Sequence, residues 1–133
     1  NNIYWSTARD AARFGLLILN KGKWQDELII EDQEYFEAMT NTSQNLNPSY
    51  GYLWWLNGKP SIIYPGNPNS FSFSLAPDAP SDLFAAMGKN GQFIDIIPSQ
   101  NLVIVRMGEA PDNSLVPILF HNEMWVRINQ VIN

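Results

Sequence analysis

The pattern of hydrophobic and polar positions is clearest in residues 83–108, where it predicts three consecutive strands. The strand-forming runs are residues 83–87, 92–97 and 102–107. The middle run holds β-branched and aromatic residues and a single acid, Asp95. Residues 98–101 read Pro-Ser-Gln-Asn, a set of turn formers that indicates a hairpin between the second and third runs. Gly88 and Gly91 flank the first corner. Because these residues have no Cβ, the backbone can turn sharply there.

A helix is predicted near the N-terminus from its cap and its apolar spacing. Thr7 is the expected N-cap, and Asp10 follows three residues later as in a capping box. The apolar positions recur at intervals of three and four residues and are Ala11, Phe14 and Ile18. Gly15 lies beside this stripe and would allow close packing against a neighbouring element. Residues 20–22, Asn-Lys-Gly, end the helix.

Two further helices are expected. Residues 23–30 read as extended chain, and residues 31–40 as a helix with acids in its first turn. The last helix has Ser114 as its expected cap and Pro117 in its first turn, where proline is tolerated. Its apolar face should lie across the sheet and contains Ile118, Trp125, Ile128 and Ile132. His121 shares this face, and we expect a satisfied histidine at the edge of the core in preference to a catalytic base or a metal ligand.

These elements predict an α+β fold, an antiparallel sheet with helices packed on it. The 133 residues are enough for one domain, and they form either a single domain or a fragment of a larger one. We expect residues 1–49 to form a helical part, and residues 50–133 to form the sheet and the C-terminal helix. Residues 71–75 alternate phenylalanine or leucine with serine, which predicts one more strand.

Four aromatic rings gather in six residues, at Tyr50, Tyr52, Trp54 and Trp55. They either form a buried strand or line a substrate cleft, since aromatic side chains give contact area at little cost in rotamer entropy. In the second case Tyr50 and Trp54 are the expected substrate-binding residues.

Composition excludes several classes of protein. The net charge is −5, and the eight Lys and Arg form no basic cluster, which argues against a nucleic-acid partner. No run approaches the roughly 20 apolar residues that span a membrane. The chain has no cysteine, and it contains neither an HExxH helix nor a phosphate-binding loop. No disulfide, metal or cofactor is therefore expected.

Lys89 stands in the first corner, in the sequence Gly88-Lys89-Asn90-Gly91-Gln92. A lysine beside free backbone N–H groups can hold a carboxylate or a developing oxyanion, because the ammonium group and the N–H dipoles both present positive charge to an anion. The alternative is an ordinary turn with a solvated lysine.

Three segments together resemble the penicillin-recognising serine hydrolases, and most closely the branch of class C β-lactamases and related esterases and amide hydrolases. The likeness to their C-terminal strands lies in residues 88–98, GKNGQFIDIIP, and 101–108, NLVIVRMG. Two earlier segments follow in the family's order, YWSTARDAARFGLLILNKGKW at 4–24 and YGYLWW at 50–55. The resemblance implies the C-terminal part of the β-lactamase/DD-peptidase-like fold.

The resemblance also implies roles for the corner residues. The family's third motif is Lys-Thr-Gly or His-x-Gly, and Lys89-Asn90-Gly91 matches it. By this likeness Lys89 would face the substrate's anionic group, and the Gln92 backbone N–H would be an oxyanion-hole donor. Asn90 and Gly91 would line the substrate. Asn90 stands where β-lactamases have Thr or Ser, so esterase or peptide-amide hydrolase chemistry fits better than antibiotic hydrolysis.

The chain lacks the family's other two motifs. No serine has a lysine three residues on, and no tyrosine begins a Tyr-x-Asn sequence. We therefore expect a C-terminal fragment of a serine hydrolase that uses an acyl-enzyme mechanism, inactive on its own, with a small ester, amide or peptide as the intact enzyme's substrate. A periplasmic or extracellular location follows from the resemblance alone. The first residue is Asn1 and no methionine precedes it, as in a processed or truncated product.

Two further expectations concern partners. A fragment of a larger sheet would expose an unpaired edge and self-associate through it. The alternative to the hydrolase is a non-catalytic binding module, in which the aromatic segment 50–55 and the acidic surface hold a peptide, a glycan or a partner protein.

Overall fold

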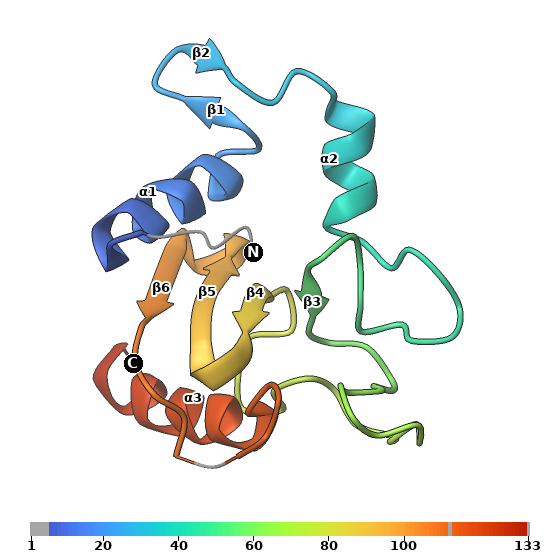
Figure 1. The fold of residues 1–133 in the computed structure, drawn as a ribbon. Helices are drawn as coiled ribbons and strands as arrows, with labels where there is room; N and C mark the ends of the chain where they lie inside the picture. Colours follow the sequence, from blue (N-terminus) through green and yellow to red (C-terminus); the bar gives the residue numbers. More distant parts are fainter. Residues whose placement is uncertain (1–5, 112, 133) are drawn as a thin grey trace.

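The computed structural model describes residues 6–111 and 113–132, which form three helices and two antiparallel sheets (Figure 1). The helices are α1 Ala8–Leu19, α2 Gln33–Met39 and α3 Ile118–Ile132. The strands are β1 Lys23–Trp24, β2 Glu27–Leu28, β3 Trp55–Leu56, β4 Phe84–Gly88, β5 Gln92–Ile97 and β6 Leu102–Arg106. Short 3-10 turns at Lys89–Gly91 and Pro98–Gln100 join the last three strands. The expected α+β class is confirmed.

The main sheet has the order β3-β4-β5-β6, with antiparallel neighbours throughout. The three strands predicted from residues 83–108 are all present, each within one residue of its expected bounds. Ile97 pairs with Leu102 across the predicted hairpin, and Asn101 takes the left-handed conformation (φ 49°) that closes it. Asparagine tolerates this conformation better than other side chains do, so no glycine is needed there.

Helices cover the sheet on both faces, with α1 on one side and α3 on the other (Figure 1). Alternation along β5 divides its side chains between them. Ile94 and Ile96 belong to the layer under α1, while Ile97 packs in the layer under α3. Gly15 of α1 lies so close to β6 that a Cβ there would come within 2.5 Å of Val103 Cγ1. The expected close packing at this glycine is therefore confirmed.

The hydrophobic core has two parts, one on each face of the sheet. The part under α3 includes Trp55, Ile62, Leu75, Leu83, Ala85, Ile97, Ile118 and Trp125. The part under α1 and α2 includes Ile18, Phe36, Met39, Trp54, Leu56, Phe84 and Ile96. Trp54 and Trp55 are neighbours in the chain but enter opposite parts. The aromatic segment was expected either to be buried or to line a substrate cleft. The burial of Trp54 and Trp55 fits the first alternative for these two rings.

The N-terminal elements follow the sequence closely. The Thr7 hydroxyl accepts a hydrogen bond from the Asp10 backbone N–H at 3.2 Å, as expected for the cap of α1. Asp32 caps α2 in the same way, through Tyr35 N–H at 2.8 Å. The segment predicted as extended folds back on itself, because Gln25 takes a positive φ (54°) and makes a hairpin of β1 and β2.

Two local predictions are wrong. Ser114 does not cap α3, which begins at Ile118; the Pro117 carbonyl accepts from His121 N–H at 3.0 Å and so starts the helical ladder. Residues 71–75 do not form a strand. Their single bridge joins Phe71 to Ile62, and a strand needs a neighbour over several residues. The phenylalanines are held instead by ring contacts, such as Phe71 stacked on Tyr64 at 4.8 Å.

Within the described residues, none of the helices has the length and apolar character needed to cross a membrane.

Candidate functional site

The Lys89 turn, defined here as residues 88–92, connects β4 to β5. Gly88 and Gln92 are paired in the ladder, so three residues form the loop between them. Two of these take left-handed backbone angles, Asn90 at φ 64° and Gly91 at φ 76°. The expectation that glycine lets the backbone turn at this corner is therefore confirmed at Gly91. Gly88 has an ordinary extended backbone (φ −109°), and Asn90 occupies the second special position in its place.

Lys89 projects from this turn into solvent. Within residues 6–111 and 113–132, its ammonium group has no hydrogen bond or ion pair. The two readings of Lys89, an anion-binding cation and a solvated turn residue, both need an exposed side chain. The positive charge is thus available to an anionic group that approaches this end of the sheet.

Two side chains brace the Lys89 turn from the β6 side. Arg106 donates through Nη1 to the carbonyl oxygens of Gly91 at 2.8 Å and Gly108 at 3.1 Å, and its guanidinium lies 4.9 Å from the centre of the Phe120 ring. The Gln92 side chain exchanges two hydrogen bonds with the Gly108 backbone, accepting from its N–H at 3.1 Å and donating to its carbonyl. Such charge-assisted and paired bonds hold the loop in one conformation.

The part of β4 that leads into the turn has an open edge. β5 pairs with all five residues of β4, whereas β3 pairs only with Phe84 and Ala85. Among the described residues, Ala86, Met87 and Gly88 therefore have no ladder partner on the β3 side. Open backbone groups of this kind bind extended ligands by adding a strand to the sheet.

Alternation decides which backbone groups face that open edge. Asn57 N–H donates to the Leu83 carbonyl at 2.9 Å, so Leu83, and after it every second residue of β4, points its backbone groups toward β3. Met87 therefore presents its N–H and C=O at the open edge. Gly88 turns toward β5, and the Gln92 N–H that pairs with it lies inside the sheet. Met87 is consequently better placed than Gln92 to donate to a ligand at this edge.

A cavity of about 510 Å³ lies beside the open edge, between α1 and the Gly88 end of the sheet. Its walls are mainly apolar and include Ala11, Leu53, Ala86 and Met107, and its polar lining residues are Ser6 and Gln92. The volume lies within the range of small-molecule sites, roughly 300–1,000 Å³. An apolar group could enter this cavity while an attached polar group meets the backbone of Met87.

The aromatic segment contributes little to this cavity. Trp54 is buried between Phe14, stacked at 6.2 Å, and Phe84, edge-on at 5.3 Å. Tyr50 packs edge-on against Trp55 at 4.8 Å. Leu53 is the member of the segment that lines the cavity, and its positive φ (66°) turns it outward. Substrate contact through Tyr50 and Trp54 thus stays a prediction from sequence.

A buried polar network on α3 and β5 escaped the sequence analysis. The Asp95 carboxylate accepts from His121 Nε2 at 2.8 Å and from Trp125 Nε1 at 2.8 Å, and all three side chains are fully buried. A signal existed, since Asp95 is the one acid of its strand and His121 and Trp125 are one helical turn apart. Because His121 reaches no solvent, it cannot act as a base on a substrate in this conformation.

Comparison with protein-family models gives no match, and a search of curated proteins finds no related sequence.

Proposed function

We propose that this chain is the C-terminal part of a serine hydrolase that forms an acyl-enzyme, and that the Lys89 turn is one rim of its active site. The proposal is supported chiefly by one juxtaposition. Among the described residues the Lys89 ammonium has no hydrogen-bond or ion-pair partner, and it stands at the end of β4, next to the edge that these residues leave open at Met87. A cation beside an open backbone N–H suits an ester or amide substrate that carries a negative charge.

The proposed reaction divides the roles between this chain and the rest of the enzyme. A serine outside these 133 residues attacks the ester or amide carbonyl, the alcohol or amine leaves, and water then releases the acid. Lys89 orients the substrate's anionic group. The Met87 backbone N–H, which faces the open edge, stabilises the oxyanion, whereas the Gln92 N–H implied by the resemblance pairs with Gly88. Asn90 and Gly91 line the substrate. A periplasmic or extracellular location belongs to the same proposal.

The test uses the protein expressed together with its upstream coding sequence, which must contain Ser-x-x-Lys. Lys89→Ala should lower kcat/KM for an anionic aryl ester by about 100-fold, the scale of loss when a substrate is no longer held in its reactive position. Lys89→Arg should retain part of the activity. Lys23→Ala, which removes an exposed lysine from β1, is the matched control and should have no effect. An upstream region without Ser-x-x-Lys, or full activity of Lys89→Ala, would rule the proposal out.

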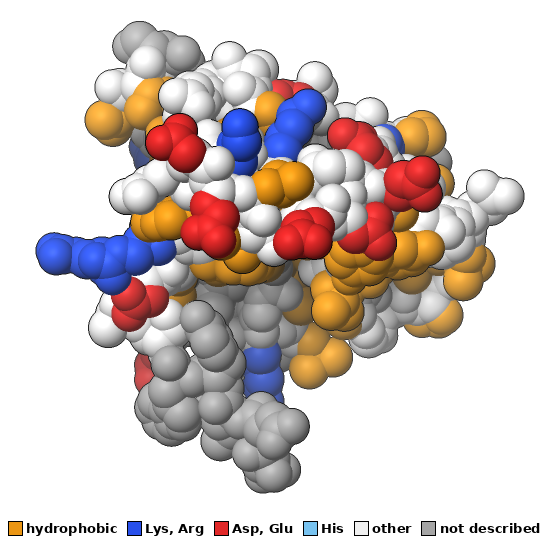
Figure 2. Space-filling view, turned by 90° about the horizontal axis from the view of Figure 1, so that it is seen from above, with side chains coloured by type: hydrophobic (Ala, Val, Ile, Leu, Met, Phe, Trp, Pro, Cys, Tyr) orange, Lys and Arg blue, Asp and Glu red, His pale blue; other side chains and the backbone are white. Residues whose placement is uncertain are grey.

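A second function, a non-catalytic binding module, is favoured by a separate observation. Tyr35 and Tyr52 stack at 6.1 Å and remain 51% and 47% exposed. Residues 26–37 supply six acids and no Lys or Arg, and Figure 2 shows acidic side chains spread across the face seen from above, with hydrophobic ones between them. Tyr52→Ala should then abolish binding of the 133-residue chain on peptide and glycan arrays. Arrays without any hit would dismiss this function.

A further inference from the structure

The chain contains two Asn-Gly pairs, Asn57-Gly58 and Asn90-Gly91. In such a pair the glycine backbone nitrogen can attack the asparagine side-chain amide carbon, because glycine has no Cβ to shield that nitrogen. A bond forms between the nitrogen and Cγ, the bond from Cγ to Nδ2 breaks, and Nδ2 takes the backbone amide proton and leaves as ammonia. Water then opens the succinimide ring to aspartate or isoaspartate. By sequence the two pairs are equal candidates for this conversion.

The fold holds the first pair in place. The Asn57 side chain is buried, donates through Nδ2 to the carbonyl oxygens of Ala76 and Pro80, each at 2.9 Å, and accepts from the Ala76 N–H at 2.9 Å. Gly58 is also packed closely, since a Cβ there would collide with the Ser81 carbonyl oxygen. Ring closure would break the buried hydrogen bonds of Asn57, and the fold therefore protects this pair.

The second pair lies in the Lys89 turn, where the Asn90 side chain is exposed. Among the described residues this side chain has no hydrogen-bond partner, and the bonds that reach Asn90 end on its backbone carbonyl oxygen. Its amide carbon can therefore react without the loss of a buried contact. Three residues separate the ladder pair Gly88 and Gln92, so the turn can change conformation locally while β4 and β5 stay paired.

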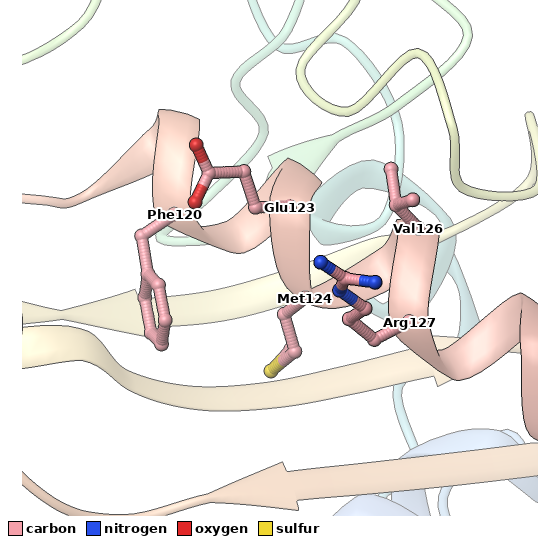
Figure 3. Close-up of a pocket in the computed structure, with 5 residues that line it drawn as sticks. All are labelled: Phe120, Glu123, Met124, Val126 and Arg127. Carbon is pink, nitrogen blue, oxygen red and sulfur yellow. The ribbon is translucent and has the colours of Figure 1, made fainter.

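Ring closure at Asn90 nevertheless requires the turn to open. With ψ at 19°, the Gly91 nitrogen lies on the side of the Asn90 backbone nitrogen and away from the side chain, so a rotation about ψ must precede the attack. Arg106 opposes this rotation, because its Nη1 donates to the carbonyl oxygens of Gly91 at 2.8 Å and Asn90 at 3.3 Å. The guanidinium is held in turn by the Phe120 ring, which Figure 3 shows directed from α3 toward the strands.

We propose that Asn90-Gly91 is the site at which this chain deamidates, and that Arg106 controls the rate by holding the turn closed. The product carries a carboxylate beside Lys89, which cancels the positive charge of the turn. In the proposed hydrolase this would weaken the hold on an anionic substrate. That consequence rests on the proposed function, whereas the conversion does not, since it needs only water and the chain itself.

The test is incubation of the 133-residue chain in mildly alkaline buffer, with peptide mapping by mass spectrometry at each asparagine. In the folded chain Asn90 should convert at least about tenfold faster than Asn57, because Asn57 must first give up its buried hydrogen bonds. In guanidinium chloride the two sites should convert at similar rates, because a glycine follows each of them. Equal rates in the folded chain, no conversion at either site, or faster conversion at another asparagine would overturn the proposal.

A pair of variants tests the role of Arg106. Arg106→Met removes the donors to the turn and should speed conversion at Asn90 about tenfold while Asn57 stays slow. Arg127→Met, which removes an exposed arginine from α3, is the matched control and should leave both rates unchanged. Circular dichroism and the Asn57 rate together report whether each variant is folded. A folded Arg106→Met that converts at the wild-type rate would overturn the control by Arg106.

Discussion

His121 Nε2 lies 2.8 Å from Oδ2 and 3.0 Å from Oδ1 of Asp95, so that α3 donates into a carboxylate in the middle of β5. Because a carboxylate only accepts hydrogen bonds, this nitrogen carries the hydrogen. Trp125, one turn further along α3, donates its Nε1–H to the same Oδ2. A buried carboxylate is costly unless it is hydrogen-bonded, so these contacts favour a single register of α3 on the sheet.

We predict that His121→Phe lowers the free energy of unfolding by about 3 kcal/mol, since it leaves a buried carboxylate short of a donor. His121→Gln keeps an N–H donor of similar reach and should lose less. Urea denaturation followed by tryptophan fluorescence measures both. Equal losses in the two variants would mean that the ring's packing, and not its hydrogen bond, stabilises the protein.

The two glycines of the Lys89 turn should respond differently to alanine. Gly91 has φ +76°, and a Cβ there would lie 2.8 Å from Arg106 Nη1, so Gly91→Ala should cost about 1–2 kcal/mol of stability. Gly88 has an extended backbone, and a Cβ would meet nothing closer than 3.6 Å. Gly88→Ala is therefore the matched control, with a change within about 0.5 kcal/mol. Thermal denaturation of both variants decides the point, and a neutral Gly91→Ala would contradict it.

A third prediction concerns the contact between α1 and β6. Alanine is normally better than glycine inside a helix by about 1 kcal/mol, yet Gly15→Ala should destabilise the fold by about 1–3 kcal/mol. The reason is that its Cβ would come within 2.5 Å of Val103 Cγ1. In a Val103→Ala background the same change should cost less, and what remains comes from Ile94 Cγ2 at 3.1 Å and Ile96 Cδ1 at 3.3 Å. A double-mutant cycle measures this coupling, and additive effects would show that the helix does not pack this closely.

The start of α1 predicts a pH dependence. The Thr7 hydroxyl, which donates to Asp10 Oδ2 at 2.7 Å, and next the Arg13 guanidinium lower the pKa of Asp10 below its usual 3.8. A lowered carboxyl pKa adds stability above the unfolded-state value, and this stability is lost as the pH falls through the folded-state value. Asp10→Asn should therefore destabilise the protein at pH 7 and make little difference well below pH ~4.

Denaturation curves at both pH values measure this difference, which should be small because Asp10 is exposed. Thr7→Val removes the hydroxyl and is the control, since it should reduce the pH dependence of the Asp10→Asn effect. A stability difference that stays constant between the two pH values would refute the role of the Asp10 charge.

Local signals in the sequence were enough for most of the secondary structure. The strands that became β4, β5 and β6 are short β-prone runs separated by turn formers, and α1 begins at a threonine cap. Each depends on residues a few positions apart. Where a partner from elsewhere in the chain was needed, local pattern failed. Residues 71–75 alternate like a strand but have a bridge at Phe71 alone, and α3 starts at Ile118, four residues beyond its expected cap.

The same distinction between local signals and distant partners applies to the candidate site. The sequence located the Lys89 turn and the need for glycine at position 91, because both follow from turn chemistry. It could not find Arg106, whose donors reach the turn from the last residue of β6, nor the open edge at Met87, which exists because β3 pairs with only two residues of β4. These features depend on how far neighbouring strands extend.

The sequence by itself thus determined the α+β class, the central strands, the helix cap and the position of the exposed lysine. Those features arise from backbone preferences and side-chain periodicity within a few residues. Only the tertiary structure decided which strand edges stay open, which aromatic rings are buried, and how Asp95 meets His121 across 26 residues of chain. Such contacts join residues far apart in sequence, and their free energy comes from burial and hydrogen bonding that exist only after the layers have packed together.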